Sequence, residues 1–431
     1  MTRPRPLNIA IIGTGIAGSV AAYHLRKEHN ITVYEAENRI GGHTHTHSVE
    51  HNGQNFQIDT GFIVFNQRTY PNFIKLLEEL DVAWKDSDMG FSVQNEKTGL
   101  EYKGSTLNSL FAQRSNLFRP SFHRMVRDVL RFNRETPAFL EDGDDSLTLS
   151  DYLKQESYSN EFIQHFIVPM GAAIWSATAS DMQRMPARFF IRFFDNHGML
   201  SVNDRPVWRV IDGGSKQYLD KLVAGHRHRI RLNTAVEWIQ RLPGGVLIKA
   251  AGEQVERFDQ VFIACHSDQA LALLADPTLE EKAVLEAIAY QRNEVVLHTD
   301  DSLLPRRKLA WAAWNYHILE KEQERVALTY NMNILQGIKS DQQFCVTLNN
   351  SEAIDEQRII RRLEYRHPVF TPEAVAAQQR QRELNEAGRT CFCGAYWRNG
   401  FHEDGVVSAL NALKHFNNRQ LHAQQDLQRT A

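Results

Sequence analysis

The sequence predicts an α/β fold that opens with a buried strand, a glycine-rich turn and a helix. The apolar run 7–12 is typical of a buried strand, and it leads directly into a Gly-x-Gly-x-x-Gly turn at 13–18. A helix over 19–27 and a second strand over 31–34 follow, and the second strand ends at Glu35. Such a turn brings backbone N–H groups onto a pyrophosphate, and the acid can accept hydrogen bonds from ribose hydroxyls. The pattern therefore predicts a Rossmann-like dinucleotide-binding domain.

The residues that follow Glu35 indicate which dinucleotide is bound. Arg39 and the pair Gly41-Gly42 come directly after the second strand, just before His43. This stretch resembles the continuation of the ADP-binding motif in flavoproteins of the amine-oxidase and phytoene-desaturase class. The resemblance implies that the cofactor is FAD and that the Gly-Gly turn passes beside its pyrophosphate and ribityl chain.

A second motif near the C-terminus agrees with FAD. A strand-like run ends at Gly394, and the segment 400–405 leads into a helix-like stretch. These residues are similar to the second flavin motif of the class, in which an acid before a helix N-terminus holds the ribityl and pyrophosphate end. The resemblance implies that Asp404, or Glu403, is this acid and that a helix beginning at Gly405 faces the flavin. A nicotinamide enzyme has no need of so distant a motif, so FAD is preferred over NAD.

The middle of the chain extends the resemblance to the cofactor. The segment 208–218 resembles the Gly-Gly turn that re-enters the flavin domain, and a buried-strand pattern over 258–265 returns toward the cofactor. In the class, residues at these places surround the adenine and the flavin. The residues expected to bind FAD are Gly13, Gly15, Ile16, Ala17, Gly18, Glu35, Ala36, Arg39, Gly41, Gly42, His43, Thr44, Val236, Ala264, Gly394, Glu403, Asp404, Gly405 and Val406.

Four segments carry a closer resemblance over nearly the whole chain. They resemble an uncharacterised bacterial subfamily of predicted NAD/FAD-binding proteins, often named amine-oxidase-like and commonly encoded beside cyclopropane-fatty-acid-synthase-like methyltransferases. The segments are 41–46, 169–176, 196–198 and 400–405.

The resemblance also implies a glutathione-reductase/amine-oxidase-type architecture with two interleaved domains. We expect an α+β substrate domain to lie over the flavin, with the ligand in the crevice between the two domains. The predicted FAD-binding domain comprises 1–80, 207–290 and 389–431, and the substrate domain comprises 81–206 and 291–388.

Composition excludes several classes of function. The 431 residues are 42% hydrophobic and 23% charged, which is ordinary for a globular protein. A formal net charge of −3 gives no general attraction to nucleic acid. The four cysteines offer no disulfide framework, and the most apolar stretch, 162–173, is too short to span a bilayer. We expect a cytoplasmic protein, with peripheral attachment to the inner membrane surface as the alternative.

Alternating histidines follow the Gly-Gly turn and resemble a metal site. In a strand, His43, His45 and His47 would point to one face. In the class, however, this place surrounds the flavin, and His43 stands where an arginine usually contacts the cofactor. Cys391-x-Cys393 has no second cysteine pair with which to form a zinc site. We therefore expect no metal.

One amphipathic run is rich in arginine. It lies in a predicted helix over 105–139, where Phe122, Met125, Val126, Val129 and Leu130 share one face. The preferred interpretation is a solvated outer face of a substrate-domain helix, and the alternative is contact with anionic lipid headgroups, which the charge balance would favour. The arginines are Arg114, Arg119, Arg124, Arg127, Arg131 and Arg134.

Two departures from the amine-oxidase pattern bear on the substrate. Amine oxidases of the class usually place a lysine near flavin N5 and an aromatic residue after the second flavin motif. Matching those positions puts Asn293 and Val406 there instead. The departures favour hydride transfer from a C–H bond of a lipid-like or fatty-acyl substrate, in a desaturation or an isomerisation. Candidate substrate-side residues are Trp175, Asn196, His197 and His402.

Other interpretations stay open. One alternative is a flavin amine oxidase, and another is a non-catalytic, flavin-bound accessory subunit of a methyltransferase or another lipid-modifying enzyme. His298, within an apolar run, is either a core histidine or a catalytic residue.

Overall fold

A five-stranded parallel sheet forms the centre of one half of the molecule, and strands from the beginning, middle and end of the chain meet in it. The computed structural model describes residues 5–201, 205–321, 325–386 and 388–430. All neighbouring strands of this sheet run parallel. Its strand order is β10 (Ile230–Arg231), β2 (Asn30–Tyr34), β1 (Asn8–Ile12), β14 (Gln260–Ile263) and β20 (Thr390–Phe392).

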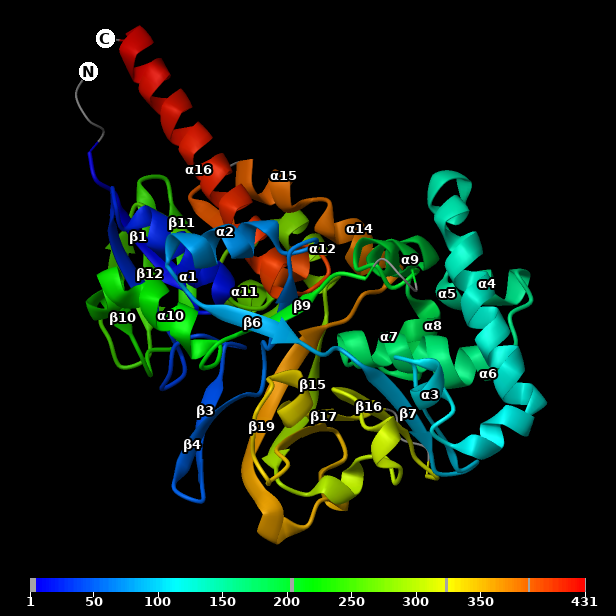
Figure 1. Cartoon of the computed structure of the whole chain (residues 1–431). Coiled ribbons are helices and arrows are strands. Elements are labelled where there is room, and N and C mark those ends of the chain that lie inside the picture. The colour runs from blue at the N-terminus through cyan, green and yellow to red at the C-terminus, as the bar shows by residue number, and fades with distance from the viewer. Residues whose placement is uncertain (1–4, 202–204, 322–324, 387, 431) are drawn as a thin grey trace.

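Helices cover one face of this sheet. Figure 1 shows α1 (Ile16–Leu25) beside the long C-terminal helix α16 (His402–Thr430) at the upper left. Together with α2 (Pro71–Glu79) and α10 (Lys216–Val223), they enclose an apolar core against the sheet. Because both faces are covered, the central strand β1 is apolar and almost wholly buried, as parallel sheets require.

The other face packs against a small antiparallel sheet and a second set of helices. This sheet has the order β11 (Val236–Leu242), β12 (Gly245–Ala250) and β13 (Glu256–Phe258). Apolar side chains from it and from the facing side of the parallel sheet form a separate core. The neighbouring helices are α11 (Ser267–Leu273), α12 (Leu279–Glu286), α14 (Pro372–Gln378) and α15 (Gln381–Glu386).

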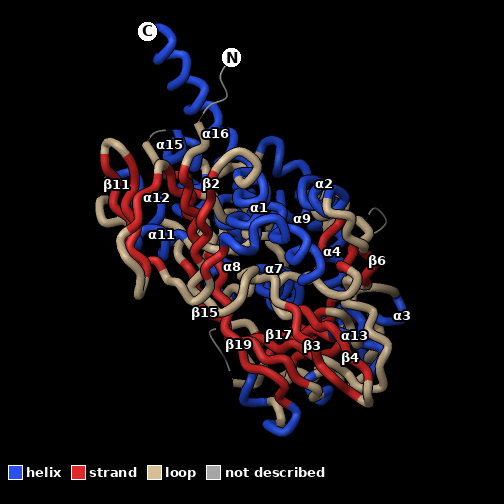
Figure 2. The backbone as a smooth tube through the Cα atoms, turned by 90° about the vertical axis from the view of Figure 1, so that its left-hand side faces the viewer, coloured by secondary structure: helices blue, strands red, loops and turns tan. Residues whose placement is uncertain are grey.

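A seven-stranded mixed sheet forms the centre of the other half. Only β16 and β7 pair in parallel, and the remaining neighbours are antiparallel. Figure 2 shows β15, β17 and β19 among the strands in the lower part of the view. The order is β19 (Ile359–Pro368), β15 (Tyr290–His298), β18 (Cys345–Leu348), β17 (Ala327–Asn331), β16 (Trp314–Ile318), β7 (Phe91–Asn95) and β8 (Leu100–Lys103).

A group of helices packs on this second sheet and shares its core. In Figure 1 these helices lie at the right, in cyan and green. They are α3 (Leu107–Leu110), α4 (Pro120–Asp142), α5 (Leu149–Gln155), α6 (Asn160–Phe162), α7 (Val168–Trp175), α8 (Ala179–Arg184) and α9 (Ala187–Asn196). In the ranges that the structure describes, no helix combines the length and the apolar character needed to cross a membrane.

Smaller elements connect the two halves. The hairpin β3 (Thr46–His51) and β4 (Gln54–Asp59) projects beside β19 (Figure 1). A three-stranded sheet pairs β9 with the two strands on either side of it. Its strands are β5 (Val64–Asn66), β9 (Trp208–Ile211) and β6 (Trp84–Ser87). The predicted domain boundaries stay a prediction.

Two predicted helices and one predicted core residue differ in the structure. The predicted helix over 105–139 is divided into α3, a 3-10 helix η1 (Arg114–Phe118) and α4, because Pro120 favours the first turn of a new helix. Leu130 is exposed rather than part of the buried face of α4, which carries Phe122, Met125 and Phe132. The C-terminal helix begins at His402, three residues before the expected start at Gly405.

Candidate functional site

One large cavity lies between the two main sheets. Its volume is about 1640 Å³, which exceeds the roughly 300–1,000 Å³ of an ordinary small-molecule site. At one end its wall is formed by residues at the ends of β1, β2 and β14. At the other end the wall is formed by aromatic residues of the seven-stranded sheet and its helices. Helices α1 and α16 both begin at its wall, with Ile16 and His402.

The glycine turn between β1 and α1 fits the approach of a pyrophosphate. Gly13 has φ +97°, which favours glycine, and its N–H donates to the Tyr34 carbonyl at 2.8 Å. A Cβ atom on Gly18 would lie 2.0 Å from the Gly13 carbonyl oxygen, so this glycine permits close helix–strand packing. On Gly15, which lines the cavity, a Cβ atom would meet nothing within 4 Å. The backbone there opens onto free space at a helix N-terminus, and the turn fits the dinucleotide.

Glu35 is a fixed, nearly buried acceptor at the end of β2. Its Oε2 accepts hydrogen bonds from the N–H of Thr14, at 3.0 Å, and from the Thr14 hydroxyl. Its Oε1 accepts from the N–H of Glu37 at 3.0 Å. The Thr14 hydroxyl oxygen also accepts from the N–H of Gly41 at 3.1 Å. Thr14 thus connects the glycine turn, the acid and the Gly-Gly turn. Sequence reasoning missed this role, although Thr14 lies inside the motif.

The Gly-Gly turn lies directly beside the first glycine turn. Gly42 has φ +56°, and a Cβ atom on it would lie 3.2 Å from Gly15 Cα. Arg39 holds this turn, because its guanidinium donates to the Gly42 carbonyl at 2.8 Å. His43 follows in the cavity wall, and its buried Nε2 has no hydrogen-bond partner within the described protein. Burial, helped by Arg39, lowers the pKa of His43 to about 4, so the ring is neutral at pH 7 and free to bond a ligand.

Two further histidines from distant segments gather around His43. The ring of His266, after β14, lies 6.4 Å from that of His43, and the ring of His367, on β19, lies 5.2 Å away. Burial lowers the pKa of each to about 3. The buried Nδ1 of His266 also has no partner in the described part of the chain. Sequence reasoning did not find His266 or His367, because only the packing of β14 and β19 in the folded chain brings them beside His43.

The histidines after the Gly-Gly turn are held by hydrogen bonds of their own. His45 Nδ1 lies 2.9 Å from the hydroxyl of Tyr365, and His47 Nε2 lies 3.2 Å from the hydroxyl of Thr60. Among the residues that the structure describes, no group of three or more His, Cys, Asp or Glu is arranged to hold a metal.

The first residue of α16 closes another part of the wall. His402 stacks on Phe62 with ring centroids 3.5 Å apart. Its Nε2 lies 3.1 Å from the Thr44 hydroxyl and 2.9 Å from the Tyr218 hydroxyl. Burial lowers the pKa of His402 well below its usual value, so this ring is neutral too. Gly405, one turn later, packs α16 on α1, because a Cβ atom there would lie 2.5 Å from Ile16 Cγ2.

The two acids of the second flavin motif line a smaller cavity of about 490 Å³, next to the large one. The Glu403 carboxylate accepts hydrogen bonds from the N–H groups of Asn72, at 3.1 Å, and Phe73, at 2.8 Å, and so holds the start of α2. Asp404 accepts from the Phe401 N–H at 2.9 Å, and burial raises its pKa to about 6. Neither acid lines the large cavity.

The structure divides the predicted site residues into a wall and a second layer. In the wall of the large cavity lie Gly13, Gly15, Ile16, Ala17, Glu35, Ala36, Arg39, Gly42, His43, Val236, Ala264 and Gly394, with the substrate-side candidates Trp175, His197 and His402. Behind it lie Gly18, Gly41, Thr44, Glu403, Asp404, Gly405 and Val406, while Asn196 lines the smaller cavity. Which of them contact FAD stays a prediction.

Away from the glycine turns the cavity wall is mostly apolar and aromatic. Trp314 and Tyr330 face each other edge-on, with ring centroids 5.1 Å apart. Asn293 does not belong to the described wall: it is buried in β15 and bonds His367 and Asn349. No lysine lines the cavity in the described ranges. The apolar members include Phe91, Phe166, Met170, Ile174, Trp175, Phe193, Phe194, Met199, Val295, Leu335, Leu348, Leu363 and Phe370.

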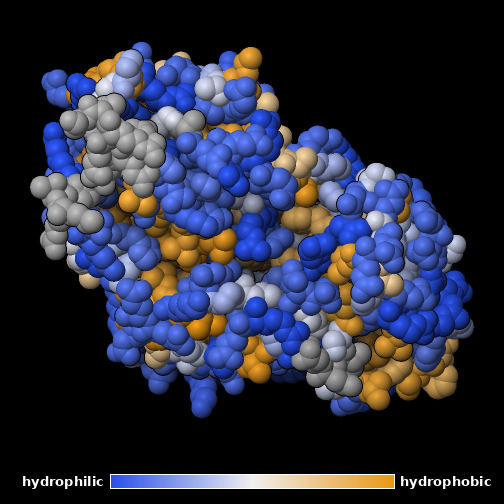
Figure 3. Space-filling view, turned by 90° about the horizontal axis from the view of Figure 1, so that it is seen from above, coloured by the Kyte–Doolittle hydropathy of each residue, from blue (hydrophilic) through white to orange (hydrophobic). Residues whose placement is uncertain are grey.

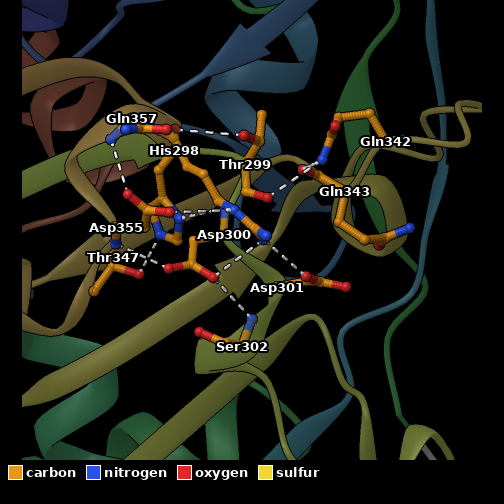
Figure 4. Close-up of polar contacts among 11 residues, drawn as sticks. His298, Thr299, Asp300, Asp301, Ser302, Gln342, Gln343, Thr347, Asp355 and Gln357 are labelled. Atoms are coloured by element: carbon orange, nitrogen blue, oxygen red, sulfur yellow. Dashed lines mark hydrogen bonds and ion pairs between the residues drawn. The ribbon is translucent and has the colours of Figure 1, made fainter.

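His298 is a core histidine in a polar corner outside the cavity. Its Nδ1 accepts from the N–H of Asp300 at 3.1 Å, so Nε2 carries the proton and donates to the Thr347 hydroxyl at 2.7 Å. Figure 4 shows both ring nitrogens engaged within this network. Of the two interpretations of His298, the structure supports the core residue.

Comparisons with solved structures show the fold. A mutant of putrescine oxidase from a redesign of its cofactor binding is 14% identical, with a TM-score of 0.68 over 96% of this chain and 100% of that chain. Cyclohexylamine oxidase from Brevibacterium oxydans IH-35A is 16% identical at the same TM-score and coverage. A CLA-producing fatty acid isomerase from P. acnes is 14% identical, again with a TM-score of 0.68 and the same coverage.

Sequence comparisons give a short match and a long one. A flavin-containing monooxygenase of Arabidopsis thaliana, FMO GS-OX5, is 50% identical over 42 residues, which are 10% of this chain and only 9% of that protein. The model of the family described as flavin containing amine oxidoreductase matches residues 16–316. Because this match covers more than half of the chain, the protein belongs to the flavin containing amine oxidoreductase family and is a flavin-dependent oxidoreductase with FAD as its cofactor.

Proposed function

We propose that this protein moves a hydride from a C–H bond of a lipid-like or fatty-acyl substrate to FAD, in a desaturation or an isomerisation. The observation that carries the proposal is the apolar wall of the cavity away from the glycine turns, together with the absence of lysine from the described wall. FAD, when bound, supplies the hydride acceptor.

The size and chemistry of the cavity suit a long apolar substrate. A volume of about 1640 Å³ leaves room for a substrate beside the dinucleotide. Each methylene group buried against this wall contributes about 0.8 kcal/mol. Trp175 and Phe193, with ring centroids 4.7 Å apart, come from facing helices and exclude water from this part of the cavity. An acyl chain therefore gains affinity along its whole length, which a small polar molecule does not.

Three histidines of the wall, His43, His266 and His402, are neutral at pH 7 because burial lowers their pKa. His402 is fixed by its stack on Phe62 and by the hydroxyls of Thr44 and Tyr218. His43 Nε2 and His266 Nδ1 offer hydrogen bonds to a bound ligand. Neutral rings suit a reaction at the uncharged C–H bonds of an acyl chain.

A flavin amine oxidase is the second candidate. The edge-on pair Trp314 and Tyr330 and the two amine oxidases among the similar structures favour it. The fatty acid isomerase among those structures favours the acyl substrate equally. An accessory subunit for a lipid-modifying methyltransferase is less well supported, because that interpretation predicts a flavin face with no cavity beside it.

Anaerobic assays distinguish these candidates. We expect putrescine and cyclohexylamine to bleach the oxidised flavin slowly or not at all. Oleate should either gain one double bond per FAD as the flavin is bleached, or shift its double bond with no net flavin reduction, and gas chromatography separates the two products. Ile174→Trp, which fills the apolar wall, should abolish acyl turnover while FAD content is retained. Val255→Trp on the exposed surface is the matched control. Fast, saturable bleaching by an amine, with no change in oleate, would replace the proposal by the amine oxidase.

A further inference from the structure

We infer that α3, η1, the start of α4 and the 3-10 helix η5 (Lys308–Ala310) form one membrane-contact surface, which rests on an anionic phospholipid bilayer. We infer further that an acyl chain enters the large cavity from this surface. The entry route rests on the proposed function, whereas the contact with the bilayer does not.

Large apolar side chains are exposed together on this surface. Phe118 is 86% exposed and Leu117 is 46% exposed, both on η1. Leu107, the first residue of α3, is 77% exposed. Leu309 of η5 is 43% exposed, and η5 lies against α3 although about 200 residues separate the two in sequence. Figure 3 shows apolar side chains gathered at the lower right edge, on the side where α3 and the start of α4 lie.

Hydrogen bonds hold these segments to one another. The Arg114 guanidinium donates to the side chain of Asn108, at 2.7 Å, and to the Phe111 carbonyl, at 2.9 Å, and so ties η1 to α3. His123 Nε2, on α4, donates to the Leu117 carbonyl at 2.8 Å. The exposed apolar residues therefore stand on a fixed platform, and fixed apolar patches rimmed by charge are typical of interaction sites.

The charge around the apolar residues is positive. Arg127 and Arg306 are exposed, and the side chain of neither has an ion-pair partner among the described residues. Arg114 bonds only uncharged oxygens, so its charge is not neutralised. The ammonium group of Lys308, in η5, lies over the ring of Trp311, which directly follows η5. Apolar residues within a rim of arginine and lysine match the interface and the headgroups of an anionic bilayer.

The surface continues into the wall of the large cavity. Gly104 and Ser105 line that wall, and Ser105 stands two residues before Leu107. The Gly104 N–H donates to the carbonyl of Phe91, another wall residue, at 3.1 Å. A Cβ atom on Gly104 would meet nothing within 4 Å, so this edge of the wall is open. An acyl chain leaving the bilayer at Leu107 would therefore reach the apolar wall directly.

Vesicle co-sedimentation of the FAD-loaded protein tests the contact. We expect binding to vesicles of phosphatidylglycerol and phosphatidylcholine in equal parts, little binding to pure phosphatidylcholine, and weaker binding in high salt because exposed charges are screened. Leu107→Ser/Phe118→Ser and Arg127→Glu/Arg306→Glu should each reduce binding at least about tenfold. The matched control is Leu279→Ser/Lys282→Glu, which changes an 80% exposed leucine and a nearby lysine on α12.

The outcomes separate this inference from the proposed function. Turnover of oleate free in solution should be the same in the Leu107→Ser/Phe118→Ser variant and the wild type, while turnover of vesicle lipid falls in the variant. Wild-type turnover of free oleate without vesicle binding would overturn the membrane contact alone. Salt-sensitive vesicle binding without turnover of any acyl chain would overturn the proposed function and the entry route, and would support the contact. Binding that is equal in the variants and the control would overturn the surface assigned here.

Discussion

At the residue scale, the end of the cavity where the dinucleotide is predicted to bind is built from local hydrogen bonds and from glycines with different tasks. Thr14 connects Glu35 to the Gly-Gly turn, and Arg39 closes that turn on itself. Gly18 serves packing, because no side chain fits between α1 and the Gly13 carbonyl, whereas Gly15 serves the ligand, because its side faces open space. The three glycines of one motif are therefore not equivalent.

Alanine at these two glycines should separate stability from cofactor binding. Gly18→Ala puts a Cβ atom 2.0 Å from a backbone oxygen, and we expect it to lower the free energy of unfolding by about 1–3 kcal/mol or more. Gly15 has φ −58°, which alanine adopts freely, so Gly15→Ala should leave the FAD-free protein within about 0.5 kcal/mol of the wild type. It should weaken FAD binding at least about tenfold, because the methyl group enters the cavity.

Urea unfolding of FAD-free protein and FAD titration by fluorescence quenching measure the two effects. Equal losses of stability in the two alanine variants, or unchanged FAD affinity in Gly15→Ala, would contradict the assignment of Gly15 to the ligand.

At the element scale, the first turn of α16 joins four parts of the molecule. His402 lines the large cavity, Glu403 holds the start of α2, Asp404 holds the preceding loop, and Gly405 packs on α1. The resemblance assigned Asp404 or Glu403 to the cofactor, and the structure shows both engaged with backbone N–H groups beside the smaller cavity. A turn with so many contacts explains why this helix starts earlier than its apolar pattern suggests.

The carboxyl group of Asp404 should make stability depend on pH. Burial raises its pKa to about 6 from the ordinary 3.8, so the folded protein holds a proton that the unfolded chain releases. Stability from this group is therefore unaffected below about pH 4, falls between about pH 4 and pH 6, and stays lower above pH 6. Asp404→Asn removes this loss, so the variant should gain stability relative to wild type as pH rises. The gap corresponds to at most about 3 kcal/mol.

Thermal unfolding of wild type and variant at pH 4 and pH 7.5 gives this difference, with FAD content measured in parallel. Asp212→Asn, at a 61% exposed side chain, is the control and should show no such trend. A wild-type-to-variant difference that is the same at both pH values would contradict the prediction.

At the scale of the whole molecule, the large cavity is assembled from both ends of the chain. Pairing of β1 with β14 and of β14 with β20 brings residues near 10, 260 and 390 into one sheet. Packing of α1 beside α16 then places two helix starts at one cavity. FAD bound in this cavity would contact segments that are far apart in sequence. A ligand that binds only the folded state stabilises the whole assembly.

FAD should therefore raise the melting temperature of the flavin-free protein more than FMN does. At a concentration about 100 times its dissociation constant, FAD stabilises by about 2.7 kcal/mol. FMN lacks the adenosine half, for which Glu35 is the predicted acceptor. Glu35→Ala removes hydrogen bonds to a charged acceptor that contribute about 2–4 kcal/mol, and should bring the FAD response close to the FMN response. Glu37→Ala, also in the cavity wall, is the control. Equal stabilisation by FAD and FMN in the wild type would contradict this placement of the adenosine half.

By itself, the sequence determined the α/β class, the cofactor and the glycine turn between β1 and α1. Apolar runs, glycine spacing and the acid at the end of β2 are local features, because a strand, a tight turn and a helix each depend on residues close together in the chain. The two segments that resemble flavin motifs, at opposite ends of the chain, could be recognised in the sequence for the same reason.

Only the tertiary structure decided which side chains meet. It placed His266 and His367 beside His43, set Thr14 between Glu35 and Gly41, and kept Asn293 out of the cavity wall. It divided one predicted amphipathic helix at Pro120, exposed Leu130, and brought η5 against α3. These contacts join residues up to about 320 positions apart, and they follow from how the sheets and helices pack, which neither periodicity nor motif spacing encodes.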